Sequence, residues 1–386
     1  MEEVLKYIEE EDGKFIRLAF RDAFGNQKNI SVMPGEIKKA FEEGIPINAK
    51  AIAGFEGSPD PFVYLKPDAS TLTVLPWRPD NGRVLRMFCD VVTPDGKPYA
   101  ADSREILRAA AARAKEAEIE FRFGSKAEFY LFKKDDEGNP TKIPYDQAGY
   151  MDIAPLDKCE NIRREISLTI EKMGLMPERS HHERGPGQNE IDFHYGKPLK
   201  AADQLTTFKM VVSTVADRNG LAADFSPKPL ADQPGNGYQI DIYVTDLREN
   251  AGSGEEPEAW AKTLAGRALA GILEKYKEIL IFLYPDPGTR ATQSACLREH
   301  GDQVRLELRL SGALGNPYLV YALLIHAGLY GIQKKLTLPQ DPSAVLDEML
   351  QSMEDAKENA RHSDFVKSVI PQEIIDQYTG SGSDVR

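Results

Sequence analysis

From about residue 100 onward, segments with strand periodicity alternate with segments of helix periodicity, and this alternation limits the fold more than any other feature. Tyr238–Val244 alternates between polar and apolar residues, which is typical of a strand with one buried face. REILRAAAARAKEAEIE, capped by Asp102 or Ser103, repeats apolar residues about every three to four positions, which indicates a helix. Because the strands carry acids at alternate positions, we predict an α+β domain whose curved, mostly antiparallel sheet is backed by helices.

The remaining elements of this large domain, which we expect to span residues 99–386, continue the alternation. The predicted strands are Phe121–Phe132, Glu190–Tyr195 and Gln303–Leu310, and the predicted helices are Cys159–Met173, Ala201–Asn219, Pro257–Leu280 and Pro317–Lys334.

Residues 1–98 have a different pattern, in which short apolar segments are separated by the turn signals DG, FGN and PGE. We therefore predict a small β-rich domain there, with a boundary near residues 97–103. Its predicted elements are a helix at Pro34–Glu43 and strands at Phe15–Phe20, Asn29–Val32, Val63–Tyr64, Leu72–Leu75 and Val84–Val92.

Composition narrows the class of protein. The three cysteines, Cys89, Cys159 and Cys296, lie far apart without CxxC spacing, which argues against a disulfide framework or a zinc knuckle. No signal-peptide pattern is present, and no apolar run reaches the roughly 20 residues of a membrane helix. The net charge of −13 argues against a nucleic-acid or anionic-membrane partner. We therefore expect a soluble cytoplasmic protein.

Three glutamates on the strand segments form a candidate metal site. Glu128 lies in GSKAEFYLF and Glu183 in SHHERGPGQNE, and Glu190 follows after a Gly-Pro-Gly turn. Because side chains alternate across a strand, acids from several strands can converge on one face. Three such acids cannot all stay ionised without a cation, and hard oxygen ligands select Mg²⁺ or Mn²⁺. The spacing alone leaves open that they are solvated acids.

One long motif resembles a known family. SHHERGPGQNEIDFHYG is similar to the metal-binding stretch of glutamine synthetases, which usually reads close to SHHEVAPGQHEIDF. The similarity extends over nearly the whole chain and includes CDVVTPDGKPYAADSRE, GSKAEFYLF, GYMDIAPLDKCENIRREI and RLELRLSGALGNPYLVYALLIHAGLYGI. It implies a β-grasp N-terminal domain, a catalytic half-barrel of curved antiparallel strands, and homo-oligomeric rings, decamers or dodecamers. It also implies a ligase of nitrogen metabolism, in which ATP phosphorylates glutamate and ammonia displaces phosphate beside two divalent cations.

The resemblance assigns roles to individual residues. Glu128, Glu183 and Glu190 match the ligands of the first metal site, and His181 and His182 are expected to support Glu183 rather than to bind metal. The other matched positions are Arg309 on the substrate carboxylate, Arg298 and Arg305 at the phosphates and acceptor, Glu178 near the nucleotide, and Gly235 and Gln239 in the substrate site. Arg309 could instead be an outward strand charge, and Glu178 an ordinary surface acid.

The second metal site of the family, normally two glutamates and a histidine, departs from the pattern. Glu307 matches one glutamate, but Lys126 and Gln239 stand at the other two positions. A protonated lysine repels a cation, so we expect Lys126 to occupy the vacated space and to pair with Glu307. The alternative is a catalytic Lys126 that acts as a base or nucleophile with a lowered pKa.

Further departures lie around this site. Asp241 and Tyr243 replace residues that touch the nucleotide, and Pro234 replaces an asparagine of the substrate flap. Asn48 replaces the aspartate that binds ammonium, and an amide cannot act as a base. The segment YPDPGTRATQS is shorter than its counterpart by about twenty residues, which removes the flap glutamate.

Three functions follow from this pattern. The first, which we favour, is a protein that uses one Mg²⁺ or Mn²⁺ to act on a glutamate-like or other carboxylate substrate. The second is an ATP-dependent carboxylate–amine ligase with an altered substrate. The third is a non-catalytic paralogue that binds a metabolite or regulates assembly. Because so many nucleotide-side residues are changed, we expect no efficient glutamine synthesis.

Overall fold

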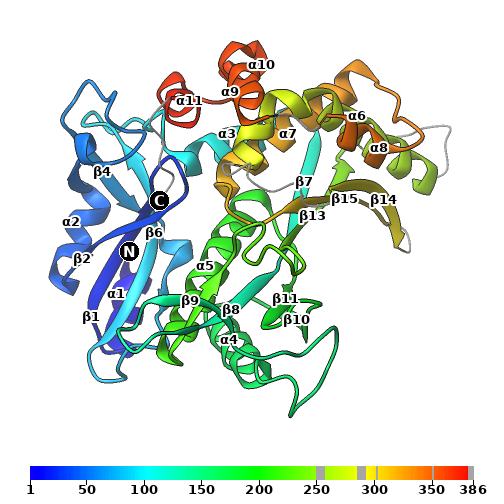
Figure 1. The fold of residues 1–386 in the computed structure, drawn as a ribbon. Coiled ribbons are helices and arrows are strands. Elements are labelled where there is room, and N and C mark those ends of the chain that lie inside the picture. The colour runs from blue at the N-terminus through cyan, green and yellow to red at the C-terminus, as the bar shows by residue number, and fades with distance from the viewer. Residues whose placement is uncertain (249–256, 285–292, 301–302, 350–351, 381–386) are drawn as a thin grey trace. The chain divides into compact units, whose positions relative to one another are not determined.

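The computed structural model describes residues 1–248, 257–284, 293–300, 303–349 and 352–380 (Figure 1). The chain forms two compact units. The first unit comprises Met1–Leu107 and Ile370–Arg386, and the second comprises Arg108–Val369. Among the described helices, none combines the length and the apolar character needed to cross a membrane.

The first unit is built on a six-stranded sheet with the order β2-β1-β6-β4-β3, and β5 pairs with β6. Strands β1 and β6 run parallel, and the other neighbours run antiparallel. The strands are β1 (Gly13–Arg21), β2 (Gln27–Val32), β3 (Ile45–Asn48), β4 (Phe62–Pro67), β5 (Thr73–Val74) and β6 (Arg83–Val92). The helical elements are α1 (Glu2–Glu10), η1 (Pro34–Glu36), α2 (Ile37–Glu42), η2 (Ala49–Ala51), η3 (Ala69–Thr71) and α11 (Gln372–Thr379). The C-terminal α11 belongs to this unit because Tyr378 is buried there and donates a hydrogen bond to the carbonyl of Ala23 at 3.1 Å.

A buried carboxylate marks the start of helix α3 (Ser103–Glu116). Asp102 accepts hydrogen bonds from the backbone N–H of Val91 at 3.0 Å and of Arg104 at 3.1 Å. Burial nevertheless raises the pKa of Asp102 to about 7, because the ionised form loses more solvation than these bonds return.

We expect the Asp102→Asn variant to lose a pH dependence that the parent protein shows. Between about pH 4 and pH 7 the unfolded parent has an ionised Asp102, whereas the folded parent keeps the proton. As the pH rises through this range, the free energy of unfolding of the parent should therefore fall relative to that of the variant, by on the order of 1.4 kcal/mol per pH unit. Urea titrations at pH 4.5, 5.5, 6.5 and 7.5 measure this difference.

Asp95→Asn is the matched control, because the pKa of the exposed Asp95 is lowered to about 2 by its hydrogen bond with Lys97. Asp95 is ionised in both states throughout this pH range, so its variant should follow the parent. A parent and an Asp102→Asn variant with parallel pH profiles would contradict the assignment of a buried, protonated carboxyl.

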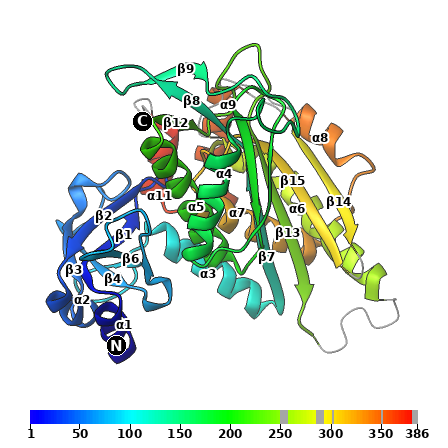
Figure 2. The ribbon, with the colours of Figure 1, turned by 90° about the horizontal axis from the view of Figure 1, so that it is seen from below.

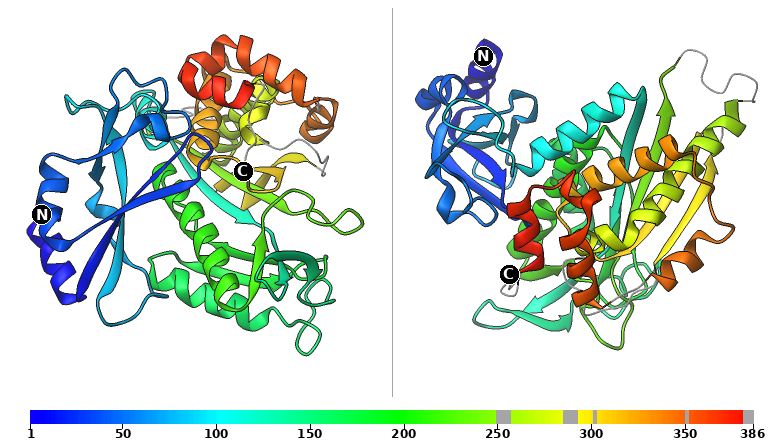
Figure 3. Two further views of the ribbon diagram at one scale, coloured as in Figure 1. Left: turned by 60° about the vertical axis from the view of Figure 1, so that its left-hand side comes forward. Right: turned by 90° about the horizontal axis from the view of Figure 1, so that it is seen from above.

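The second unit contains an antiparallel sheet in which β14, β15, β13 and β7 lie side by side (Figure 2). Its strands are β7 (Ile119–Ala127), β13 (Gly237–Asp246), β14 (Ser294–His300) and β15 (Gln303–Ser311). Helix α6 (Pro257–Leu283) covers one face of the sheet and packs on α7 (Pro317–Lys334) (Figure 3). The stacked rings of Phe123 and Tyr321, 4.3 Å apart, are part of the core between sheet and helices.

A second antiparallel sheet in this unit has the order β10-β11-β8-β12, with β9 on β8. Its core includes Phe129, Phe193, Phe208 and Phe225, whose rings contact one another. The strands are β8 (Phe129–Lys134), β9 (Pro140–Pro144), β10 (Pro177–His182), β11 (Gln188–Phe193) and β12 (Leu221–Asp224). The other helices are α4 (Glu160–Lys172), α5 (Pro198–Arg218), α8 (Pro342–Glu348), α9 (Met353–His362) and α10 (Asp364–Lys367).

The joint between these two sheets falls within Phe121–Phe132, which the sequence predicts as one strand. That prediction is wrong, because the segment divides into β7 and β8, which belong to different sheets. Glu128 is the residue between them, and its N–H donates to the carbonyl of Gly237 at 3.1 Å. The two sheets therefore meet at Glu128.

Candidate metal centre

A pocket of about 740 Å³ in the second unit is lined by residues from both of its sheets. Most of the residues that the sequence singles out for a site meet there. They are Lys126, Glu128, Glu183, Glu190, Gly235, Gln239 and Arg309.

The fold brings the three glutamates of the predicted first metal site into this pocket from different elements. Glu128 lies between β7 and β8, Glu183 directly follows β10, and Glu190 lies on β11. The turn between β10 and β11 is closed by a hydrogen bond from the N–H of Glu183 to the carbonyl of Gln188 at 2.8 Å. Strand pairing places His181 opposite Glu190. Residues far apart in sequence are thereby held on one wall.

The electrostatics of this wall favour a bound cation. Burial, followed by the charges of Asp192 and Glu128, raises the pKa of Glu190 to about 8. Burial also raises the pKa of Glu128 to about 7, although the N–H of Gly237 donates to its Oε2 at 2.8 Å. The acids resist ionisation because they share a poorly solvated space, and a divalent cation would relieve that cost.

His181 contacts Glu183 directly, which fits its expected supporting role. Its Nε2 lies 2.7 Å from Oε1 of Glu183. Donor atoms of His181, Glu183 and Glu190 all lie within 4.8 Å of one another, and Glu128 faces the same pocket. Carboxylate oxygens with one imidazole fit Mg²⁺ or Mn²⁺, so these residues are the ones that could hold such an ion.

The turn between β10 and β11 requires glycine at Gly187, whose φ is +69°. A Cβ there would lie 2.8 Å from the carbonyl oxygen of Leu131, which is backbone and cannot rotate away. We expect Gly187→Ala to lower the free energy of unfolding by about 2 kcal/mol and to weaken Mn²⁺ binding, because the turn positions two of the acids. Urea denaturation and Mn²⁺ titration measure the two effects.

Gly138→Ala is the control for this prediction. Gly138 also has a positive φ, +85°, but nothing lies within 4 Å of its added Cβ. It should cost only about 1 kcal/mol of backbone strain and leave Mn²⁺ affinity unchanged. Equal losses of stability and affinity in both variants would show that the close approach at Gly187 is unimportant.

Next to the acids, the four-stranded sheet presents polar residues in rows across its strands. One row consists of Lys126, Gln239 and Arg309, paired across β7, β13 and β15. Oε1 of Gln239 accepts from Arg309 Nη2 at 3.0 Å, and its Nε2 donates to Oδ1 of Asp241 at 2.8 Å. The Gln239 amide therefore holds one N–H of the Arg309 guanidinium, and Arg309 lines the pocket. In the next row, Asp241 lies opposite Glu307.

Lys126 does not form the ion pair with Glu307 that we expect from the sequence. Its Nζ lies 3.8 Å from Oδ2 of Asp192 and 3.9 Å from Oδ2 of Asp241. Both acids are buried, and the lysine side chain is 17% exposed. The reason is the strand order, which places β13 between Lys126 on β7 and Glu307 on β15, so that Asp241 on β13 is the nearer acid. Lys126 instead links β7 to β11 and β13.

Glu307 has other cationic partners. Its Oε2 lies 3.3 Å from Arg305 Nη2 and 3.8 Å from Arg298 Nε. Arg305 also contacts Asp241, with Nη1 3.2 Å from Oδ2. Glu307, Arg298, Arg305 and Asp241 therefore form a set of charges that compensate one another.

Other residues singled out by the sequence have local partners. Glu178 is partly exposed and pairs with Nδ1 of His194 at 2.9 Å. The ring of Tyr243 lies tilted against that of Tyr195, with ring centroids 4.4 Å apart. The carbonyl of Pro234 accepts from the Tyr130 hydroxyl at 2.6 Å.

Two departures noted in the sequence lie elsewhere. Asn48, in the first unit, accepts from the N–H of Lys50 at 3.0 Å at the start of η2. Most of the shortened segment YPDPGTRATQS, residues 285–292, lies outside the described residues.

Sequence reasoning missed two residues that hold the site together. Asp192 lies two positions after Glu190 on β11, so the period of two along a strand was the available signal for its facing the same side. Gln188 donates from Nε2 to Oε2 of Glu128 at 2.8 Å and to the carbonyl of Gly235 at 3.0 Å. Gln188 lies two positions before Glu190 on the same strand, so the period of two was the available signal for this residue as well.

Comparison with known families accounts for both units. Residues 12–94 match the β-grasp domain of glutamine synthetase, and residues 100–291 and 288–382 match its catalytic domain. These matches confirm the predicted β-grasp and catalytic folds.

Individual proteins give the same result. Glutamine synthetase of Clostridium saccharobutylicum is 36% identical over 378 residues, which cover 93% of this chain and 85% of that protein. The Methanosarcina mazei enzyme is 33% identical over 411 residues, covering 98% and 92%. A solved GmaS–ADP complex has a TM-score of 0.81 at 24% identity, covering 97% of this chain and 93% of that one. Plasmodium falciparum glutamine synthetase has a TM-score of 0.82 at 19% identity, covering 98% and 94%.

Proposed function

The chain belongs to the glutamine synthetase family, and we propose that within it this protein is a one-cation enzyme that acts on a glutamate-like or other carboxylate substrate. Glu128, Glu183 and Glu190 hold one Mg²⁺ or Mn²⁺, with His181 beside them. The raised pKa values of Glu128 and Glu190 support this assignment, since buried acids that resist ionisation favour a cation.

One observation carries the proposal that a second cation is absent. Glu307 is paired with Arg305 and Arg298, and Lys126 sits between Asp192 and Asp241. Enzymatic phosphoryl transfer depends on mobile divalent cations that bridge phosphate oxygens. In this chain, fixed ammonium and guanidinium groups supply the positive charge beside Asp192, Asp241 and Glu307, so nucleotide-dependent glutamine synthesis is not supported.

The chain's own residues bind and orient the substrate. Arg309, fixed by Gln239, offers two parallel N–H groups to a carboxylate, and the backbone of Gly235 lies in the same pocket wall. Gln188 keeps Glu128 turned toward the cation site. A bound cation supplies polarisation of a second oxygen group on the substrate. A substrate with two separated acidic or carbonyl groups therefore fits best.

Counting bound ions tests the proposal. Titration of the purified protein with Mn²⁺, followed by electron paramagnetic resonance of the free ion, should give one tight site per chain, with or without ATP. An assay for ADP release with glutamate and ammonia should show no turnover comparable to that of an ordinary glutamine synthetase. Two ions per chain in the presence of ATP, together with rapid ADP release, would refute the proposal.

A second candidate is a ligase that still uses ATP but joins a different acid and amine. The retention of Arg298 and Arg305 on adjacent strands favours it, because these match the residues that neutralise phosphates in the family. The ADP-release assay, repeated with panels of carboxylic acids and amines, separates the two candidates. The ring assembly of the family also remains a proposal for this chain, and mass photometry tests it directly.

A further inference from the structure

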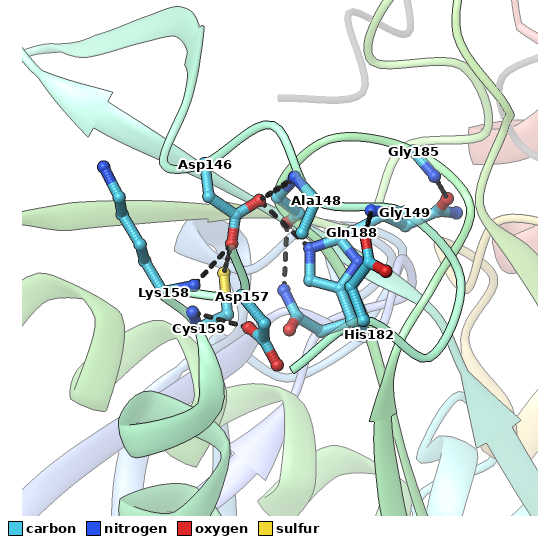
Figure 4. A network of polar contacts seen from close by, with 12 residues as sticks. Asp146, Ala148, Gly149, Asp157, Lys158, Cys159, His182, Gly185 and Gln188 are labelled. Carbon is cyan, nitrogen blue, oxygen red and sulfur yellow. Dashed lines mark hydrogen bonds and ion pairs between the residues drawn. The ribbon is translucent and has the colours of Figure 1, made fainter. Parts of the chain in front are cut away.

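The turn that carries Glu183 and leads to Glu190 is hydrogen-bonded to one buried carboxylate, that of Asp146. Its Oδ1 accepts from the N–H of Gly187 at 2.8 Å and lies 3.0 Å from Nε2 of His182. Neither the Asp146 nor the His182 side chain is exposed to solvent. Figure 4 shows these two side chains facing each other across the network. Asp146 lies between β9 and α4, so a distant segment of the chain supports the turn.

His182 extends this support to a residue of the cation site. Its Nδ1 lies 2.7 Å from the carbonyl oxygen of Glu183. A carbonyl oxygen can only accept, so Nδ1 carries a proton and donates it there. Asp146 thus holds the turn at two places, directly at Gly187 and through His182 at Glu183.

The same neighbourhood contains a group of potential metal ligands, namely Asp146, Asp157, Cys159 and His182, whose donor atoms lie within 4.8 Å of one another. Their hydrogen-bonding capacity is already used. Oδ2 of Asp146 accepts from the thiol of Cys159 at 3.3 Å, and Asp157 accepts from Arg163 and from the N–H of Cys159. A cation there would have to displace these donors and would face the Arg163 guanidinium, so the group reads as a hydrogen-bonded support.

We infer that Asp146 and His182 are positioning residues that set the separation of Glu183 from Glu190 and thereby the affinity of the cation site. The inference rests on the proposed function, because it requires that Glu183 and Glu190 bind a cation. Hydrogen-bond partners behind metal ligands commonly change metal affinity by about 10- to 100-fold when they are removed. The distances here are those of direct hydrogen bonds, so an effect of that size is expected.

The test compares Mn²⁺ binding in four full-length proteins, namely the parent, Asp146→Asn, His182→Asn and Cys159→Ser. Asp146→Asn keeps the shape of the side chain but replaces one acceptor oxygen with an NH2 group, which cannot accept the hydrogen bonds that the carboxylate accepts. His182→Asn keeps a donor at the position of Nδ1 and loses the contact with Asp146. Cys159→Ser is the matched control, since it changes the same buried network but preserves a donor to Asp146. Each protein is examined by Mn²⁺ titration, by the resonance line shape of the bound ion, and by its melting temperature without metal.

We expect Asp146→Asn to bind Mn²⁺ about 10- to 100-fold more weakly than the parent, with a changed line shape, and His182→Asn to lie between the two. Cys159→Ser should keep a Mn²⁺ affinity within about twofold of that of the parent, even if its melting temperature falls as much as that of Asp146→Asn. If Asp146→Asn does not fold, His182→Asn decides the matter by the same readouts.

Folded Asp146→Asn and His182→Asn proteins with parental affinity and line shape would overturn the inference. So would a loss in Cys159→Ser as large as that in Asp146→Asn, because the effect would then follow general destabilisation. A parent that binds no Mn²⁺ would instead refute the proposed function itself, so the two failures are distinguishable.

Discussion

Glu190→Gln is expected to weaken Mn²⁺ binding by about 100-fold and, at the same time, to stabilise the metal-free protein. The first effect follows because an amide oxygen replaces one of the anionic ligands of the site. The second follows from the pKa of about 8 that burial and the neighbouring acids impose on Glu190. Above about pH 4.5 the unfolded parent ionises at this residue while the folded, metal-free parent keeps the proton, so parental stability falls as pH rises toward 8.

The variant lacks this proton linkage, so its advantage in melting temperature should be small at pH 4.5 and largest near pH 8. Adding Mn²⁺ should reverse the order, because the parent gains more binding free energy than the variant. Scanning calorimetry with and without Mn²⁺ at both pH values measures the reversal. Glu120→Gln, on β7 and outside the pocket, is the control and should bind Mn²⁺ within about twofold of the parent. A variant that is less stable than the parent without metal would contradict the account.

Lys126→Met is expected to lower the free energy of unfolding by about 3 kcal/mol at pH 7. The substitution keeps most of the apolar side chain but removes the ammonium between Asp192 and Asp241, both of which are buried. Arg179 remains near Asp192 and Arg305 near Asp241, which keeps the expected loss at the lower end for a broken buried ion pair. Urea denaturation in the absence of metal measures it.

Lys142→Met is the matched control, because the Lys142 side chain is 63% exposed where it pairs with Asp224 at 2.7 Å. It should cost less than about 1 kcal/mol. The double variant Lys126→Met with Asp241→Asn should recover part of the loss, since it removes one of the two acids left without the lysine. Equal effects in Lys126→Met and Lys142→Met would show that Lys126 is only an exposed charge.

Much of the fold follows from periodicity. Helices α3, α5 and α7 and strand β13 lie where the patterns of apolar residues predict them, because these elements bury one face or are buried throughout. The strand predicted at Phe121–Phe132 fails because its apolar alternation runs through Glu128 without interruption. The break follows from a change of partner: the segment pairs with β13 up to Ala127 and with β11 and β12 from Phe129 onward, and all three partners are distant in the sequence.

The candidate site also has parts that the sequence predicts and parts that it does not. Glu128, Glu183 and Glu190 are recognisable because they lie in a long motif, and all three line one pocket. The partners of Lys126 are not recognisable, since ion pairs across strands depend on register and that register emerges only when β7, β13 and β15 are assembled. The contact of Asp146 with His182 joins residues 36 positions apart, and nothing local in either segment indicates it.

The ammonium of Lys126 is tethered to the backbone, whereas a divalent ion comes and goes with its concentration. The charge beside Asp192 and Asp241 therefore does not vary with the magnesium activity of the surroundings, and a chelator cannot extract it. The electrostatic character of the region around Lys126 therefore stays the same when the glutamate site loses its ion. Loss of metal from the glutamate site would therefore leave the positive charge between Asp192 and Asp241 in place.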